Sequence, residues 1–426
     1  MMNMMISFGI YYETIQKKMM TIKNKKYLYI KLWVIVLAFF FNACGTEKKM
    51  RPGLYLLESD RVKQIDWRDD RNLEDLCHAV DQSISYYKRL PQRYRFSYSH
   101  LKYSPQEMIT SMTIFKDLIK NTTKEDLPQK IDKIFHVFES RNSNQQAFFT
   151  AYYEPELEGC IQRSDQFPVP LYEKPPDLTR VHLGKFNTKY KGEWITGRVK
   201  GKSFVPYESR DEIVYKNSLE SRAEVIAFVK NHVELFFLQI QGSGKICFEK
   251  DDTCIQVNYA AQNGHPYRAV GRLLKDEIPK EKMSLQAIKE YLYNHPDEIR
   301  RILQYNPSYT FFRVVSKGPL GNIEVPLTAW RSIAMDHKKI PKGGLAFYQT
   351  TIPEYDNSMI KDWRPVQCFA LVQDTGGAIR GHGRADIFLG SGKKAEKLAG
   401  PMQQTGRILL LVARKEFIEL HKPVID

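Results

Sequence analysis

The sequence lacks a hydrophobic run long enough for a membrane-spanning helix. The apolar stretch near its start, residues 32–41, is well short of the roughly twenty residues that such a helix needs. Internal repeats, low-complexity segments and the cysteine and histidine spacing of a zinc site are also missing. The rest, 42% hydrophobic and 27% charged over 426 residues, is typical of a globular protein with room for two domains. We therefore expect folded domains and no metal ion or other cofactor.

Cysteine is scarce. Once Cys44 is set aside five remain, at positions 77, 160, 247, 254 and 368, and their odd number leaves at least one thiol unpaired within the chain. Cys247 and Cys254 flank the segment FEKDDT. In an oxidising compartment this segment is a candidate hairpin loop closed by a disulfide. The alternative is that both thiols stay free.

The N-terminal residues have the order of a secretory signal peptide. Lysines precede the apolar run, and the small residue Ala43 stands directly before Cys44. Residues 41–44 (FNAC) resemble a bacterial lipobox, in which the cysteine is lipidated and becomes the mature N-terminus. We expect a lipid on Cys44, a membrane anchor through that lipid, and an outer-membrane lipoprotein of the cell envelope that faces the periplasm. A plain secreted protein or an inner-membrane-anchored one is the alternative.

Helical patterns dominate residues 70–140. Apolar side chains recur at helical spacing behind Asn72, which has the position of an N-cap. Residues 104–107 (SPQE) form a capping box with proline at the first helical position. We expect these helices to serve as scaffold.

From about residue 147 the pattern changes to aromatic and β-branched residues interrupted by glycine and proline, which favours strands joined by tight turns. The predicted strands include residues 148–153, 169–172, 235–241 and, buried on both faces, 407–412. Helices are expected again over residues 284–293 and 297–305, on either side of Pro296.

Residues 373–388 (QDTGGAIRGHGRADIF) bring two carboxyl groups into one short segment with a glycine-rich turn between them. Asp374 closes an apolar strand, and Asp386 stands in apolar sequence. A carboxyl group in apolar surroundings is harder to ionise, so its pKa rises and it can hold the proton that a general acid needs. The alternative is structural: Asp374 caps the turn through its side chain, and Asp386 pairs with Arg380 or Arg384.

A second polar cluster follows one of the predicted strands. Gln239, Gln241 and Ser243 carry amide and hydroxyl groups suited to recognising N-acetyl and hydroxyl groups. The overlapping residues 242–245 (GSGK) lack the earlier glycine of a phosphate loop and are followed by Ile246, so we exclude nucleotide binding. The surroundings of Ser243 also lack the nucleophile-elbow pattern of a serine hydrolase.

Residues 373–388, together with residues 326–336 (PLTAWRSIAMD) and 340–343 (IPKG), resemble the C-terminal three-aspartate (3D) domain of the membrane-bound lytic transglycosylase A (MltA) family. The three matching aspartates are Asp336, Asp374 and Asp386. The other blocks that resemble the family are residues 149–155 (FTAYYEP), 237–244 (FLQIQGSG) and 258–267 (NYAAQNGHPY). The blocks follow one another in the family's order from about residue 147 to 412, and this joint order makes the resemblance specific.

The resemblance implies a mainly β fold with N-terminal helices, in which a double-psi β-barrel carries a second, inserted β-rich domain. We expect a signal peptide over residues 1–43, helices and the first part of the barrel over 44–155, the inserted domain over 156–308, and the rest of the barrel with the 3D domain over 309–426. Glycan would bind in the groove between the two domains.

The resemblance also implies an enzyme, a lytic transglycosylase that cuts the glycan strands of peptidoglycan. Asp386 would protonate the glycosidic oxygen between N-acetylmuramic acid and N-acetylglucosamine, and would then take the proton of the muramyl 6-hydroxyl as a 1,6-anhydro ring closes. Most glycosidases need a carboxyl group on each side of the bond, whereas a nucleophile within the sugar lets one residue act twice. Asp374 would support the cationic transition state electrostatically.

Further residues are expected to contact the glycan: Thr150 and Tyr153, and also Asp336 and Arg384. The net charge of +15 suits the carboxylates of the wall polymer, and an exported protein rarely meets nucleic acid, so we expect no nucleic-acid partner. A solvated basic surface without any partner is the plain alternative. Two other functions stay open: a noncatalytic, expansin-like wall-binding protein, and a hydrolytic muramidase in which water attacks.

Overall fold

The computed structural model describes residues 51–248, 253–279, 283–356 and 359–421. Cys44 and the predicted signal peptide lie outside these residues, so the lipid anchor stays a prediction. Within the described ranges, none of the helices combines the length and the apolar character needed to cross a membrane.

Six strands close into a barrel. Their order is β19, β16, β17, β15, β18 and β5, and β5 pairs back with β19, while β4 and β1 extend the sheet beyond β19. The strands are β1 (Gly53–Leu56), β4 (Phe135–Arg141), β5 (Ala147–Glu154), β15 (Ser332–Ala334), β16 (Leu345–Asp356), β17 (Met359–Asp374), β18 (Arg384–Ser391) and β19 (Gln404–Ala413). The pairs β5–β18 and β15–β17 are parallel. This barrel confirms the predicted mainly β fold.

The predicted buried strand over residues 407–412 is confirmed as part of β19. Its residues from Ile408 to Ala413 are all fully buried. β16 covers one edge of β19 and β4 the other. A run of apolar side chains without alternation is therefore what this position requires.

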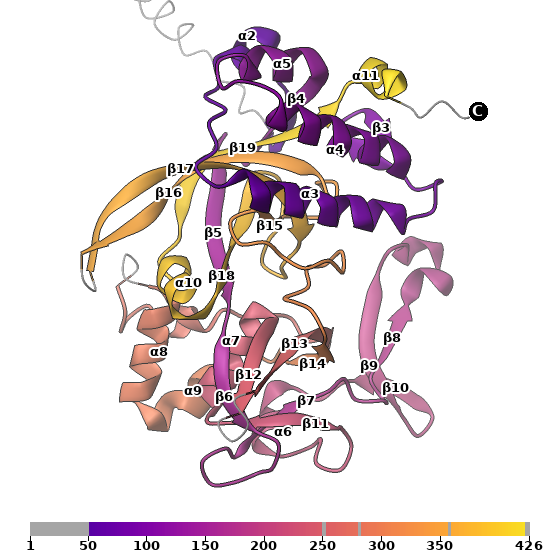
Figure 1. Cartoon of the computed structure of the whole chain (residues 1–426). Helices are drawn as coiled ribbons and strands as arrows, with labels where there is room; N and C mark the ends of the chain where they lie inside the picture. Colours follow the sequence, from indigo (N-terminus) through magenta and orange to yellow (C-terminus); the bar gives the residue numbers. More distant parts are fainter. Residues whose placement is uncertain (1–50, 249–252, 280–282, 357–358, 422–426) are drawn as a thin grey trace, which may run out of the picture. The chain divides into compact units, whose positions relative to one another are not determined.

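The N-terminal helices pack against the barrel (Figure 1). Asn72 caps α3 by accepting a hydrogen bond from the Asp75 amide, and Ser104 and Glu107 complete the capping box of α4, as predicted. The helices and small strands of this part are α2 (Ser59–Lys63), α3 (Leu73–Lys88), α4 (Pro105–Lys120), α5 (Leu127–Ile134), α10 (Gly392–Ala399), α11 (Lys415–Leu420), β2 (Phe96–Tyr98) and β3 (Leu101–Tyr103).

A second sheet of six strands has the order β14, β13, β12, β6, β11 and β7. Its strands are β6 (Glu156–Cys160), β7 (Val169–Tyr172), β11 (Val225–Val229), β12 (Ser243–Phe248), β13 (Thr253–Gln262) and β14 (Thr310–Val315). Cys247 and Cys254 face each other across β12 and β13 and form a disulfide, which confirms the candidate pair. The described free thiols are those of Cys77, Cys160 and Cys368.

The predicted strand over residues 235–241 is wrong, because these residues belong to the helix α7 (His232–Gln241). Asn231 caps its start by accepting a hydrogen bond from the Glu234 amide, and Gly242, at φ 80°, ends it in a left-handed turn. Six of its ten residues are buried. A helix that is buried on most sides shows no polar face, so its sequence resembles a buried strand.

Of the two later helices, the first is confirmed and the second is shorter than predicted. α8 (Leu285–Asn294) begins after Ser284, whose side chain accepts a hydrogen bond from the Ala287 amide. α9 spans only Ile299–Leu303, after a 3₁₀ turn over Pro296–Glu298. The remaining helix of this region is α6 (Arg210–Tyr215).

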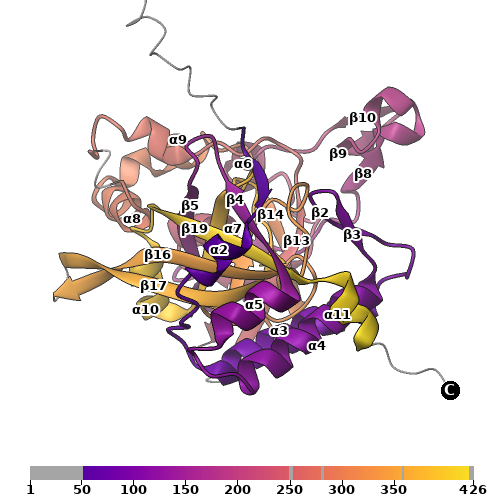
Figure 2. The same cartoon turned by 90° about the horizontal axis from the view of Figure 1, so that it is seen from above.

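A small sheet of three strands, which we call the arm, comprises β8 (Thr179–His182), β9 (Trp194–Lys200) and β10 (Ser203–Pro206) (Figures 1 and 2). It is joined to the rest by an ion pair between Arg198 and Glu208, at 2.7 Å. Gly264, at φ 86°, lies so close that an added Cβ would stand 2.7 Å from the Cβ of Thr196. Only glycine fits at this contact.

Candidate active site

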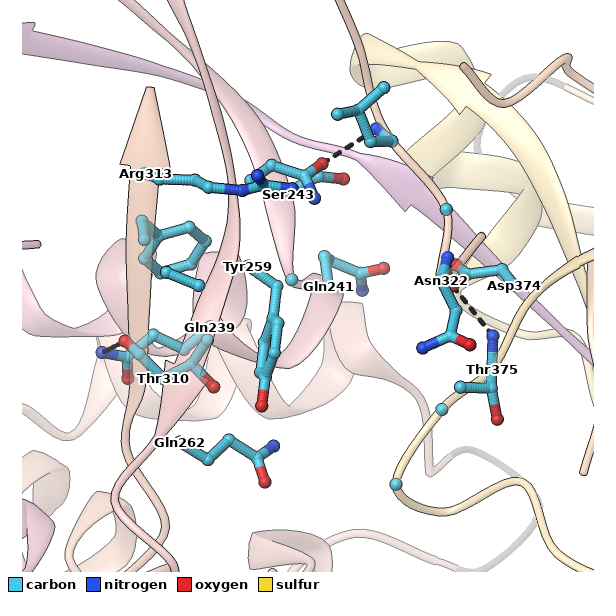
Figure 3. A pocket seen from close by; sticks show the side chains of 18 of the residues that line it. Gln239, Gln241, Ser243, Tyr259, Gln262, Thr310, Arg313, Asn322, Asp374 and Thr375 are labelled. Carbon is cyan, nitrogen blue, oxygen red and sulfur yellow. Dashed lines mark hydrogen bonds between the residues drawn. The ribbon is translucent and has the colours of Figure 1, made fainter. Parts of the chain in front are cut away.

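A cavity of about 770 Å³ lies between residues of the second sheet and the turn that follows β17. Figure 3 shows its two walls: Gln239, Gln241, Tyr259 and Gln262 stand on one side, and Asn322, Asp374 and Thr375 stand across from them. A smaller cavity of about 180 Å³ adjoins it, because both are lined by Gln239 and Gln262, and Asp386 lines the smaller one. The two predicted acids are thus brought to one composite site.

Asp374 is the last residue of β17, and hydrogen-bond donors surround its carboxyl group. The amides of Thr375 and Asn322 donate to its Oδ1 at 2.8 and 3.0 Å, and the Tyr152 hydroxyl donates to its Oδ2 at 2.7 Å. The bond from Thr375 is the turn-capping contact that the structural alternative predicted. Because that carboxyl also lines the large cavity, capping and a role in the site are compatible.

Asp386 lies on β18, where the parallel register places it opposite Thr150 of β5. The Thr150 hydroxyl donates a hydrogen bond to Asp386 Oδ1. Arg384 donates in turn to Thr150 Oγ1 at 2.8 Å and to the Ala385 carbonyl at 2.6 Å. The structural alternative, a direct pair of Asp386 with Arg380 or Arg384, is not what the structure shows: Arg384 is linked to Asp386 through the Thr150 hydroxyl.

Both acids have raised pKa values. Burial raises the pKa of Asp374 to about 6; the hydrogen bonds from Tyr152, Thr375 and Asn322 act against this rise, and the nearby Asp386 adds to it. Burial likewise raises the pKa of Asp386, against the positive charge of Arg384 and the hydrogen bond from Thr150. Two neighbouring carboxyl groups of this kind can hold a proton close to neutral pH.

Asp336 lies beneath the glycine-rich turn and is buried. Its carboxylate accepts hydrogen bonds from the amides of Gly381 and Lys338, at 2.8 and 3.0 Å. Burial, the largest single influence, raises the pKa of Asp336. These hydrogen bonds and the nearby Arg380 act in the opposite direction, and together they bring the pKa below its ordinary value. Asp336 is not among the described residues that line either cavity, so its carboxylate fixes the turn.

The predicted polar cluster sits at the end of α7 and the start of β12. The Gln239 amide is held on both sides: its oxygen accepts from buried Arg210 at 2.6 Å, and its nitrogen donates to the Thr310 carbonyl at 3.3 Å. Gln241 accepts from the Tyr153 amide at 3.3 Å, and Ser243 is buried in the cavity wall. Gln241 is the member of this cluster whose amide points toward the wall with Asn322 and Asp374 (Figure 3).

The Tyr153 side chain lies elsewhere. It is buried on the face of β5 opposite to Thr150 and Tyr152, and it lines a separate cavity beside Glu396. Tyr153 is connected to the large cavity by its backbone amide, which donates a hydrogen bond to the Gln241 side chain.

Comparison with known proteins agrees with the fold. The model of the MltA-specific insert domain matches residues 148–313, and the model of the 3D domain matches residues 331–412. Both matches are to domains of the MltA family. The membrane-bound lytic murein transglycosylase A of Escherichia coli is 32% identical over 267 residues, which are 62% of this chain and 65% of the E. coli protein.

Solved structures of MltA proteins have the same fold. A membrane-bound lytic murein transglycosylase from Agrobacterium tumefaciens is 28% identical, with a TM-score of 0.70 over 85% of this chain and 98% of its own. The E. coli MltA structure with bound chitohexaose is 24% identical, with a TM-score of 0.66 over 86% of this chain and 96% of its own. At that identity the second likeness concerns the fold alone.

The sequence did not predict two residues that hold Asp374. Tyr152 was open to prediction, because period-two alternation along β5 places it on the same face as Thr150. Asn322 was not, since it lies in a loop that only the tertiary fold brings to β17. Among the described residues, no group of three side chains is arranged to hold a metal ion.

Proposed function

We propose that the protein is a peptidoglycan lytic transglycosylase, which cleaves the β-1,4 bond between N-acetylmuramic acid and N-acetylglucosamine and leaves a 1,6-anhydromuramyl end. The observation that carries this proposal is the unequal hydrogen bonding of the two acids. Asp374 accepts three hydrogen bonds, whereas Asp386 accepts one, from Thr150, among the described residues. Donors favour the ionised form of a carboxyl group, so the two acids are suited to different tasks.

Asp386 is the acid and then the base. Its Oδ2 accepts no hydrogen bond from the described residues, so that oxygen is free to carry a proton and to give it to the glycosidic oxygen. Once ionised, the same oxygen takes the proton of the muramyl 6-hydroxyl as that hydroxyl attacks the anomeric carbon. The proton count is balanced over the two half-steps, and no water enters the product.

Asp374 is the anion that supports the cationic transition state. Its three donors keep the negative charge in place, which is the arrangement that electrostatic stabilisation needs. Its pKa of about 6 leaves it mostly ionised at neutral pH.

The remaining predicted residues fall into two groups in this proposal. Gln241 and Ser243 contact the sugar, and Gln239 shapes the wall beside them. The others act through protein groups: Thr150 and Arg384 orient Asp386, Asp336 fixes the turn, and Tyr153 positions Gln241 through its backbone amide. The E. coli structure with bound chitohexaose supports an oligosaccharide ligand for this fold.

The finer fold assignment belongs to the same proposal. We assign the closed barrel to the double-psi class and the second sheet to an inserted domain, with glycan in the groove between them. The strands of the second sheet and of the arm, β6 to β14, stand in the sequence between β5 and β15 of the barrel. The proposal includes a location in the cell envelope and a lipid anchor at Cys44, and relatives named as membrane-bound support it.

Analysis of products from purified peptidoglycan tests this function. A transglycosylase gives muropeptides with a 1,6-anhydro end that borohydride does not reduce, because no free hemiacetal remains. Reducible ends would mean that water attacks and that the protein is a hydrolytic muramidase. Binding to peptidoglycan without any product would instead leave an expansin-like binding protein.

A further inference from the structure

A second large cavity, of about 670 Å³, lies between the arm and β13. We call it the arm pocket. It is continuous with the cavity that contains Asp374, because Lys174, Tyr259 and Gln262 line both. A ligand bound beside Asp374 can therefore extend into the arm pocket. The proposed function gives this pocket no role.

The lining of the arm pocket is aromatic and positively charged. Trp194 and Tyr259 are 47% and 44% exposed, which is unusual for large aromatic side chains. Arg180 lies 4.5 Å above the Trp194 ring, with its charge also close to Tyr259. Lys174 is the second cation, and no aspartate or glutamate is among the described residues that line the pocket.

These two cations differ from other basic residues nearby. Arg198, on the same arm, is paired with Glu208 at 2.7 Å. Arg180 and Lys174 form no ion pair with the described residues, and both are exposed. An unpaired arginine held against an aromatic ring keeps its guanidinium donors available for a carboxylate.

We propose that the arm pocket binds the acidic stem peptide that branches from the muramyl residue of the substrate. This inference rests on the proposed function, because it requires a muramyl sugar beside Asp374. Peptidoglycan carries its carboxylates on the peptide, whereas the glycan is rich in neutral amide and hydroxyl groups. A pocket with two free cations and no acid suits the carboxylates of the peptide. Because the pocket adjoins the cavity proposed for the sugar, a peptide attached to the muramyl residue can enter it.

The arm is held firmly enough to form one wall of such a pocket. Its contact at Gly264 leaves no room for a Cβ beside Thr196, and the ion pair of Arg198 fixes β9. His182 stacks on Trp194 at 4.5 Å, which holds the indole ring in place. A preorganised aromatic and cationic wall binds a flexible peptide at a lower entropic cost.

The test compares two substrates with one variant. Arg180→Glu reverses the charge in the arm pocket and leaves the residues beside Asp374 in place. We expect its kcat/KM to fall about tenfold or more on peptide-bearing peptidoglycan, and to be unchanged on glycan strands stripped of peptide by an amidase. Lys200→Glu, which makes the same charge change on β9 away from the pocket lining, serves as the control. Arg180→Lys is expected to restore part of the loss.

Calorimetry with the acidic stem tetrapeptide alone adds a readout that does not depend on cleavage. Wild type is expected to bind it, with weaker binding at higher salt, and Arg180→Glu is expected not to. Equal losses on both substrates would overturn the inference in favour of a glycan subsite, and no loss on either would overturn it outright. If wild type binds the tetrapeptide but cleaves neither substrate, the proposed function fails while the peptide site stands.

Discussion

Thr150 and Asp386 face each other across a parallel strand pair, and the threonine hydroxyl donates to one oxygen of the carboxyl group. The other oxygen accepts no hydrogen bond from the described residues, and Asp386 lines the smaller cavity. Arg384 fixes the threonine from behind, at 2.8 Å. The orientation of the proposed acid is thus set by two strands of the barrel, whose backbone pairing is rigid.

Asp386→Asn is expected to fold, to bind peptidoglycan and to be inactive. Asparagine has the size of aspartate but neither gives nor takes the proton in the two half-steps. General acid–base catalysis contributes roughly 10² to 10⁴-fold in rate, and the loss should reach the upper part of that range. Chromatography of released muropeptides measures it, with circular dichroism as the control for folding. Full activity in this variant would remove Asp386 from catalysis.

Asp374→Asn is expected to reduce activity less completely, because the amide dipole replaces part of the electrostatic support. The two variants are compared in the same muropeptide assay. Equal losses would indicate that the roles of the two acids are divided wrongly.

Asp374→Asn should also change how stability depends on pH. Burial raises the pKa of Asp374 in the folded protein to about 6, above its ordinary value of 3.8. The stability contributed by its neutral form is full below pH 3.8 and is lost as the pH rises through about 6. The variant should therefore be more stable than wild type at pH 8, by about 3 kcal/mol, and the difference should shrink toward pH 4. Urea unfolding at both pH values checks this; a difference that does not vary with pH contradicts it.

Thr150→Val is expected to move the alkaline limb of the activity profile upward. The hydroxyl of Thr150 stabilises the ionised form of Asp386, and without it the pKa of Asp386 rises further. The acid then keeps its proton to a higher pH, by up to about one unit if the bond contributes about 1 kcal/mol. The measurement is kcat/KM against pH, with Thr113→Val on the exposed side of α4 as the control. A limb that shifts downward would contradict the proposed order of proton transfer.

Gln241→Ala is expected to weaken glycan binding several-fold while the fold stays intact. A neutral hydrogen bond to a ligand contributes on the order of 1 kcal/mol, and the Gln241 amide points toward the wall with Asn322 and Asp374 (Figure 3). Binding to insoluble peptidoglycan is compared with that of Gln106→Ala, on the exposed face of α4. Unchanged affinity would leave Gln241 with only its bond to the Tyr153 amide.

Cys44→Ser tests the lipid anchor, which lies outside the described residues. The variant is expected to appear as a soluble protein or as an unprocessed precursor, since serine offers no thiol for lipidation. Membrane fractionation and the mass of the mature N-terminus provide the readout. Processing at the same position with continued membrane association would rule out the lipobox.

Local patterns predicted some parts of this molecule well. The caps at Asn72 and Ser104 are contacts within one turn, so residue types at fixed spacing define them. The two acids also lie in one segment, and burial could be read from their neighbours. In contrast, α7 was taken for a strand because its burial removed the polar face that reveals a helix.

Other parts of the site depend on contacts that no local pattern contains. Asn322 meets Asp374 only because a loop after the second sheet returns to the barrel. Arg210 and Gln239 lie 29 residues apart and pair inside the protein. The prediction of Tyr153 rather than Tyr152 as a site residue has another cause. The family resemblance identified the sequence block that contains both tyrosines, but it did not show which face of β5 each side chain occupies.

The parallel pairing of β5 with β18 joins residues that are 236 positions apart, as the bond between Thr150 and Asp386 shows. A chain is made from its N-terminus, so β5 exists long before its partner does. Such distant pairing also forms slowly, because a long loop must close first. Newly made protein therefore holds no assembled proton donor until its last strands have arrived and docked. For the proposed activity, which would cut the cell's own wall, this order of assembly delays cleavage until the fold is complete.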